Sequence, residues 1–199
     1  LGASSREVAA ALVSAGLEPG DRVGLWAPNG LAWIVAMIGT QLAGGVLVPL
    51  STRYKGREAA YILGRSGASF LFAAGEFLGT DYPELLEGHP LPELRRRIAL
   101  DHADVDGQGG SAGRRTDWTG WKAFLSEATG GAEREVRRRT EAVAADDMSD
   151  LMFTSGTTGN PKGVIAAHGQ SLRVFREWAG IVGLRFADRY LIVNPMSHT

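Results

Sequence analysis

Short apolar runs that alternate with helix-like patterns over residues 22–73 constrain the fold of this chain most strongly. The apolar runs are residues 22–27, 46–50 and 70–73. The second run, Val-Leu-Val-Pro-Leu, is apolar at every position, which is typical of a strand covered on both faces. Between the runs, residues 30–42 and 56–65 place apolar side chains at helical spacing. Strand, helix, strand, helix, strand at this spacing predicts a parallel sheet with right-handed crossovers, and therefore an α/β fold.

Further elements are predicted on either side of this pattern. An amino-terminal helix would begin with Ser4 or Ser5 as its N-cap and end at Gly16. A short strand is predicted over residues 98–100. The apolar side chains of residues 118–125 have the spacing of a buried helix face. The charged stretch 134–139 predicts a helix face exposed to solvent.

The last part of the chain continues the alternation of strands and helices. A strand is predicted over residues 164–167, a helix over 170–182 and another strand over 189–193. The helix carries apolar side chains at helical spacing, and we expect these to point inward: Leu172, Phe175, Trp178 and Ile181.

Composition and charge exclude several classes of protein. The 199-residue chain has a formal net charge of −1, so charge gives no case for a nucleic-acid or anionic-membrane partner. No apolar run is long enough to span a bilayer. Cysteine is absent, which excludes disulfides, thiolate catalysis and cysteine metal sites within this span and fits a reducing compartment. We therefore expect a cytoplasmic protein without a transmembrane segment.

One stretch of small polar residues interrupts the apolar pattern. Three apolar residues, Leu-Met-Phe, lead into Thr154-Ser155-Gly156-Thr157-Thr158-Gly159-Asn160-Pro161-Lys162-Gly163. Glycine and hydroxyl residues disfavour a helix or strand here and favour a loop, either the tip of a hairpin or a link between adjacent strands. Such a loop offers hydroxyl groups, unhindered backbone N–H groups and one ammonium group, which together suit a polyphosphate.

Three other interpretations of this loop are weaker or remain open. A Gly/Ser/Thr-rich run is often a linker, but linkers rarely lie between two apolar strands. A Walker P-loop requires Gly-Lys followed by Ser or Thr, whereas Pro161 precedes the lysine here and Gly163 follows it. From the residues alone, a structural turn remains an alternative to a phosphate site.

The run from Thr154 to Gly163 resembles the signature loop of the adenylate-forming superfamily, which includes acyl-CoA synthetases, luciferases and peptide-synthetase adenylation domains. Further similarities are the Pro-Gly-Asp turn at 19–21, Pro28-Asn29 and Ala43-Gly44-Gly45. The resemblance implies the front part of a large amino-terminal domain, with mostly parallel sheets flanked by helices. It also implies activation of a carboxylic acid with ATP, release of pyrophosphate, and thioester formation with coenzyme A.

The resemblance implies a role for each residue of the loop. Binding of the ATP phosphates is expected from the hydroxyl, glycine and lysine residues Thr154, Ser155, Gly156, Thr157, Thr158, Gly159 and Lys162. A Mg²⁺ ion that bridges the phosphates would be bound with the help of Thr157 or Thr158. The family's remaining equipment, including the acidic Mg²⁺ ligand and the lid lysine, has no counterpart within residues 1–199, so we do not expect this span alone to complete the reaction.

Two histidines follow the loop. His168 stands where the family has a histidine that opens the next helix, and we expect a structural role for it. His198 ends the run Pro195-Met196-Ser197-His198, which resembles a family segment whose histidine lies beside the reacting carboxylate. We therefore treat His198 as the candidate catalytic residue, because a neutral imidazole can donate a hydrogen bond to a carboxylate or phosphate oxygen.

Within the superfamily, residues 71–79 and 188–195 are similar to bacterial fatty-acid-type CoA ligases, a group that includes ligases for propanoate-bearing remnants of steroid rings. We divide the span into sheet-helix units (1–100), a variable loop region (101–147) and a phosphate-loop region (148–199) of one partial domain. The expected partners are a small carboxylate, ATP and coenzyme A, and a homodimer is an open alternative to a monomer. The rival functions are an amino-acid-activating adenylation domain, a luciferase-like oxidase and a non-catalytic nucleotide-binding module.

Overall fold

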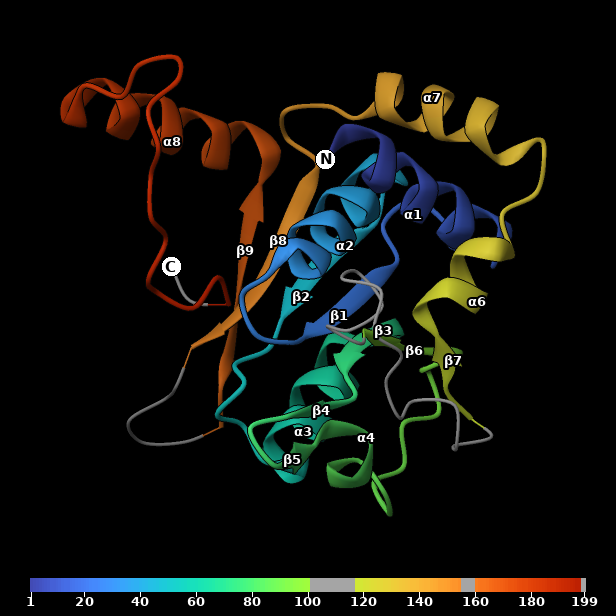
Figure 1. The fold of residues 1–199 in the computed structure, drawn as a ribbon. Helices are drawn as coiled ribbons and strands as arrows, with labels where there is room; N and C mark the ends of the chain where they lie inside the picture. The colour runs from blue at the N-terminus through green and yellow to red at the C-terminus, as the bar shows by residue number, and fades with distance from the viewer. Residues whose placement is uncertain (101–116, 155–159, 198–199) are drawn as a thin grey trace.

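A computed structural model describes residues 1–100, 117–154 and 160–197 of the chain (Figure 1). Within these residues the main sheet has seven strands in the order β7-β6-β3-β1-β2-β8-β9, and β4 pairs with β5 separately. The strands are β1 (Arg22–Trp26), β2 (Val46–Pro49), β3 (Ala68–Ala74), β4 (Glu76–Phe77), β5 (Thr80–Asp81), β6 (Arg96–Leu100), β7 (Thr119–Gly120), β8 (Met148–Thr154) and β9 (Lys162–Ala167). The helices are α1 (Gly2–Ser14), α2 (Leu31–Leu42), α3 (Gly56–Ser66), α4 (Tyr82–Leu85), α6 (Trp121–Ser126), α7 (Ala132–Ala142) and α8 (His168–Val182).

The centre of the sheet has the parallel arrangement that the sequence predicts. Strand β1 pairs in parallel with β2 on one side and with β3 on the other. The crossover from β1 to β2 through α2 and the crossover from β2 to β3 through α3 run in opposite directions across the sheet. Right-handed connections therefore place α2 and α3 on opposite faces of the sheet (Figure 1). Every residue of β2 and β3 is buried, which confirms that these strands are covered on both faces.

Aromatic side chains fill the core on both sides of the sheet. The ring of Trp26 meets that of Tyr82 edge to face, with centroids 4.8 Å apart, and Trp26 Nε1 donates a hydrogen bond to the Ser51 carbonyl. Phe72 packs edge to face against Phe124 of α6 at 5.6 Å. Edge-to-face pairs of this kind satisfy the ring quadrupoles as well as burying area. The prediction of a buried helix face near residue 121 is therefore confirmed.

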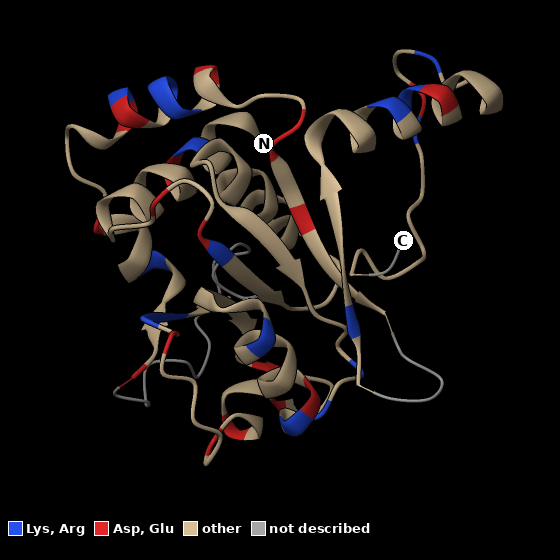
Figure 2. Ribbon diagram, turned by 180° about the vertical axis from the view of Figure 1, so that it is seen from behind, with Lys and Arg blue, Asp and Glu red and all other residues tan. Residues whose placement is uncertain are grey.

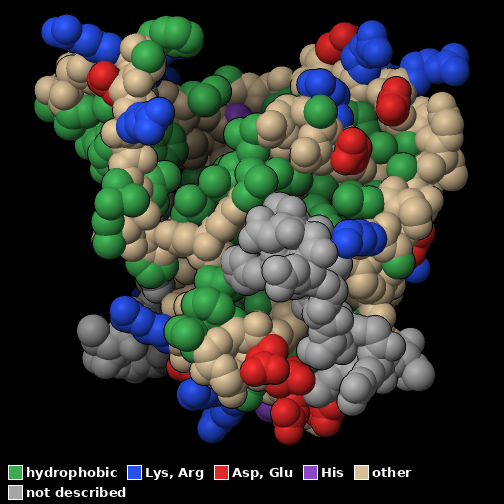
Figure 3. Space-filling model, viewed as in Figure 1, with side chains coloured by type: hydrophobic (Ala, Val, Ile, Leu, Met, Phe, Trp, Pro, Cys, Tyr) green, Lys and Arg blue, Asp and Glu red, His purple; other side chains and the backbone are tan. Residues whose placement is uncertain are grey.

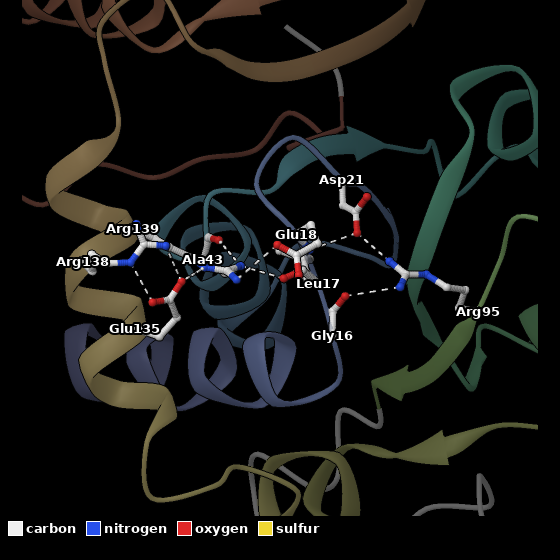
Figure 4. Close-up of polar contacts among 9 residues, drawn as sticks. All are labelled: Gly16, Leu17, Glu18, Asp21, Ala43, Arg95, Glu135, Arg138 and Arg139. Carbon is white, nitrogen blue, oxygen red and sulfur yellow. Dashed lines mark hydrogen bonds and ion pairs between the residues drawn. The ribbon is translucent and has the colours of Figure 1, made fainter.

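The charged stretch 134–139 lies on α7, and one of its charged residues is buried, so the prediction that the whole stretch is exposed is wrong. The Arg139 side chain is only 8% exposed, whereas that of Arg138 is 68% exposed. Arg139 Nη1 donates to the carbonyl oxygens of Leu17 and Ala43 at 2.6 and 3.2 Å. Ala43 is the C-cap of α2, and Leu17 lies in the turn that follows α1. A single guanidinium group therefore caps α2 and ties α7 both to that helix and to the turn after α1 (Figure 4).

A carboxylate on α7 completes this cluster. Glu135 accepts hydrogen bonds from both Arg138 and Arg139 at 2.7 Å. These two guanidinium groups lower the pKa of Glu135 to about 2. The carboxylate therefore stays ionised through the physiological range and holds both arginines in place (Figure 4).

The turn between α1 and β1 is held from the opposite side as well. Arg95 Nη2 lies 2.5 Å from the Asp21 carboxylate, and Arg95 Nη1 donates to the Gly16 carbonyl at 3.3 Å (Figure 4). The turn from Gly16 to Asp21 is thus fixed between α7 and the start of β6. Gly16 itself has φ of +83°, which fits the predicted end of the first helix.

Helix α1 starts earlier than expected. It begins at Gly2, with Leu1 at the N-cap, so the prediction of Ser4 or Ser5 as the cap is wrong. Ser5 is fully buried inside the helix, and the described residues give its hydroxyl no hydrogen-bond partner.

The predicted helix after the hairpin is present as α8, but its apolar face is not covered by the described residues. Leu172, Phe175 and Ile181 are 69%, 60% and 83% exposed, so the prediction that they point into a core is wrong. The helix leaves the end of β9 away from the main sheet (Figure 1), and hydrophobic side chains gather on this side of the molecule (Figure 3). The spacing of the apolar residues correctly predicts the helix, but it does not specify which surface packs against that helix.

The strand predicted over residues 189–193 is absent. These residues form neither helix nor strand, and Leu191 and Val193 are 80% and 78% exposed. A strand requires a neighbour that pairs with its backbone, and no described strand pairs with this segment. The side chain of Tyr190 instead packs edge to face on Trp178 of α8.

Charged residues of both signs are interspersed along the helices and turns that surround the sheet (Figure 2). Strands β1, β2 and β3 carry Arg22 as their sole charged residue. Among the helices of the described ranges, none combines the length and apolar character that a bilayer span requires. The fold is therefore a mixed α/β sheet with an apolar centre and with most of its charged residues on the surrounding helices and turns.

Candidate functional site

The signature loop connects β8 to β9 in an antiparallel hairpin at one side of the sheet. Thr154, the last residue of β8, pairs directly with Lys162, the first residue of β9. The Thr154 hydroxyl lies 3.5 Å from the Lys162 carbonyl oxygen. Of the two connections that the sequence left open, the hairpin is the one formed, and β9 begins two residues earlier than predicted.

This hairpin tip lies at the carboxyl edge of the parallel strands. Strand β8 pairs in parallel with β2 through Leu47 and Asp150, and β2 is parallel to β1. The carboxyl ends of β1, β2 and β8 therefore meet at the same edge of the sheet. Ligands of open α/β sheets bind outside this edge, because the connecting loops there are free to supply polar groups.

Of the predicted phosphate-binding residues, the described part of the chain contains Thr154 and Lys162, and it brings them together across the hairpin. Lys162 is exposed, and no carboxylate of the described ranges forms an ion pair with it. The other predicted residues lie outside the described residues: Ser155, Gly156, Thr157, Thr158, Gly159 and His198. The structure thus places the two ends of the loop for which phosphate binding is predicted, Thr154 and Lys162.

Two contacts that the sequence did not reveal support this edge. The Tyr61 hydroxyl, on α3, lies 3.5 Å from the carbonyl oxygen of Pro161, which precedes Lys162. The side chain of Asn29 bonds the backbone at Asn194 and Met196, just before His198. In the sequence, Asn29 stands out only through the Pro28-Asn29 similarity to the superfamily, and no local pattern signals a partner 165 positions away.

His168 has the structural position expected of it. It is the first residue of α8, and its backbone N–H donates to the Asp147 carbonyl at 3.1 Å. Burial raises the pKa of Asp150 above its usual range, and the Ser149 hydroxyl at 2.5 Å and the nearby His168 oppose that shift. Asp150 lies four residues before Thr154 within β8, so Asp150 and His168 are separate from the hairpin tip.

A hollow of about 690 Å³ lies at the opposite, amino-terminal edge of the sheet. Its walls come from the starts of β1, β2 and β8, from α7 and from His168, and include Arg22, Arg138 and Asp147. The guanidinium of Arg22 already donates to the carbonyls of Gly20, Ser66 and Gly67. The arginines that line this hollow therefore already have hydrogen-bond partners within the fold. The carboxyl edge of the sheet remains the candidate site.

Comparison with known proteins agrees with a nucleotide-binding α/β class. Residues 1–199 match the protein family described as AMP-binding enzyme. The chain is 43% identical over 190 residues to the 3-[(3aS,4S,7aS)-7a-methyl-1,5-dioxo-octahydro-1H-inden-4-yl]propanoyl:CoA ligase of Mycobacterium tuberculosis, covering 96% of this chain and 35% of that protein. It is 41% identical to the ligase of the same name from Rhodococcus jostii, covering 98% of this chain and 37% of that protein.

A solved structure supports the same assignment. The fatty acyl CoA synthetase of Mycobacterium tuberculosis superposes with a TM-score of 0.66 at 28% identity, covering 98% of this chain and 34% of that one. The chain belongs to the AMP-binding enzyme family. It spans about a third of the length of the curated relatives that it matches.

Proposed function

We propose that the complete protein activates a carboxylic acid with ATP, forms an acyl-adenylate with release of pyrophosphate, and then transfers the acyl group to coenzyme A. The observation that carries this proposal is the signature loop at the carboxyl edge of the sheet, with Thr154 opposite Lys162 at its ends. The two relatives above 40% identity are named as CoA ligases, which supports a CoA ligase over an amino-acid-activating domain.

The chemical problem is the meeting of two anions. A carboxylate oxygen attacks the α-phosphorus of ATP, the bond from that phosphorus to the oxygen bridging to the β-phosphate breaks, and pyrophosphate leaves. The Lys162 ammonium would offset charge on the leaving group, because it is exposed beside the loop and forms no ion pair among the described residues. The hydroxyls of Thr154, Ser155, Thr157 and Thr158 and the backbone N–H groups of Gly156 and Gly159 would hold the phosphates in line.

A magnesium ion fits the chemistry of this loop, and when bound it would neutralise charge on the phosphates. Hydroxyl oxygens such as those of Thr157 and Thr158 are hard donors of the kind that Mg²⁺ accepts alongside phosphate oxygens. In the described ranges, no three His, Asp or Glu side chains cluster as a metal site. The loop would supply hydroxyl oxygens, and the remaining ligands would come from the nucleotide, from water and from the acidic residue that the resemblance places outside residues 1–199.

The proposal for how the carboxylic-acid substrate is bound rests on His198 and on the names of the relatives. His198, two residues after Met196, would donate a hydrogen bond to the reacting carboxylate. We propose that this carboxylate belongs to a propanoate side chain on a fused-ring ketone, as in the names of the two relatives, rather than to a simple fatty acid. The reaction would take place in the cytoplasm, where ATP and coenzyme A are available.

ATP–pyrophosphate exchange by the complete protein tests this function. The panel should contain the bicyclic propanoate, fatty acids of several lengths and the common amino acids. We expect exchange with the bicyclic propanoate, weaker exchange with fatty acids and none with amino acids. Exchange with amino acids alone would assign the protein to the peptide-synthetase type, and no exchange with any acid would favour a non-catalytic nucleotide-binding module.

A further inference from the structure

The side chain of Asn29 holds a distant segment of the chain by two hydrogen bonds. Its Nδ2 donates to the carbonyl oxygen of Asn194, and its Oδ1 accepts from the backbone N–H of Met196, both at 2.8 Å. A primary amide carries a donor and an acceptor on one rigid plane. Two bonds from one plane fix the direction of the bound backbone as well as its position, as a neighbouring strand would.

This contact is the point at which the chain after α8 returns to the core. From Tyr190 to Val193 every residue is exposed and outside any strand or helix. Among the described residues, Asn29 supplies the hydrogen bonds to the stretch from Asn194 to Met196, and the partly buried Met196 side chain packs against the core. The position of this stretch therefore depends on one amide group and one apolar side chain.

The contact also lies at the proposed catalytic edge. Asn29 is in the turn that follows the carboxyl end of β1, and Thr154 ends β8 at the same edge of the sheet. The bound segment continues into Ser197 and the candidate His198. The anchored residues 194–196 are therefore held at the same edge of the sheet as Thr154 and directly precede His198 in the sequence.

We propose that Asn29 is a positioning residue for the adenylation reaction: by holding the backbone of residues 194–196, it sets the entry of the segment that contains His198. This inference rests on the proposed function. Asn29 would touch neither ATP nor the acid. Because reacting groups must be placed to within a fraction of an ångström, loosening this anchor should reduce turnover without weakening ATP binding.

Two substitutions of Asn29 distinguish an effect of the anchor on turnover from an effect on the stability of the fold. Asn29→Ala removes both bonds, and we expect it to lower kcat for exchange about tenfold to a hundredfold while KM for ATP and the unfolding temperature stay close to wild type. Asn29→Asp keeps the acceptor, but as a carboxylate it cannot donate to the Asn194 carbonyl. A protonated carboxyl restores the donor, so the activity of Asn29→Asp relative to wild type should rise as the pH falls.

Gln41→Ala, which removes a carboxamide from the opposite end of α2, is the matched control and should leave kcat unchanged.

Hydrogen exchange of the Met196 amide gives a readout that does not depend on activity. In the complete protein we expect this amide to exchange about fivefold to tenfold faster in Asn29→Ala than in wild type. Equal exchange would show that the anchor does not form and would overturn the inference, as would a wild-type kcat in Asn29→Ala. A loss of kcat accompanied by an equal loss in folded protein would also overturn it. If wild type shows no pyrophosphate exchange while Met196 is protected, the proposed function fails and the positioning role of Asn29 in that reaction fails with it.

Discussion

Replacing Lys162 with Ala is expected to slow ATP–pyrophosphate exchange by the complete protein about tenfold to a hundredfold, the range lost when one charge-assisted hydrogen bond to a transition state is removed. Lys162 is exposed at the start of β9, where its backbone pairs with Thr154. Alanine keeps this backbone pairing, so the fold should be unaffected. The measurement is kcat for exchange at saturating ATP, with thermal unfolding alongside it.

Lys122→Ala is the charge-matched control for this experiment, because Lys122 lies on α6, away from the hairpin. We expect it to retain the wild-type exchange rate. Lys162→Arg, which keeps the positive charge but changes its shape, should recover part of the lost rate. A wild-type rate in Lys162→Ala would remove this lysine from the site.

Replacing Arg139 with Ala is expected to lower the free energy of unfolding by about 3 kcal/mol. The side chain is 8% exposed and donates to the carbonyls of Leu17 and Ala43, so its loss leaves the turn after α1 and the C-cap of α2 without their donor. Glu135 would lose one of its two guanidinium partners at the same time. Denaturant or thermal unfolding of the complete protein measures the change.

Arg138→Ala is the matched control on the same helix. Arg138 is 68% exposed and its hydrogen bonds go to Glu135 alone among the described residues, so its loss should change stability little. Arg139→Lys should be intermediate, because an ammonium group cannot reproduce the planar fork that reaches both carbonyls and Glu135. Equal unfolding curves for Arg139→Ala and Arg138→Ala would show that the buried guanidinium does not tie the helices together.

Local patterns were sufficient for the centre of the fold, whereas for the loop from Thr154 to Gly163 they left a hairpin and a link between adjacent strands both open. Strands β1, β2 and β3 are apolar runs bounded by turns, and each can be found within a short window of sequence. The hairpin that places Thr154 opposite Lys162 also depends on neighbouring residues, eight positions apart. In each of these cases the interactions that decide the structure are close in the chain.

Features that depend on distant partners were missed. Arg139 lies within a run of charged residues, and its burial is decided by carbonyls 96 and 122 positions away. Asn29 has partners 165 and 167 positions away. The spacing of apolar residues on α8 predicts a helix correctly, but it carries no information on which surface packs against Phe175 or Ile181. Residues 189–193 have strand-like composition without a described strand to pair with.

A crystal structure of the complete protein with a non-hydrolysable ATP analogue and magnesium tests the role of the hairpin tip most directly. We predict that the β- and γ-phosphates lie against the loop from Thr154 to Gly163, with the Lys162 ammonium within hydrogen-bonding distance of a phosphate oxygen. A triphosphate bound elsewhere, with this loop making no contact to it, would contradict the proposed site.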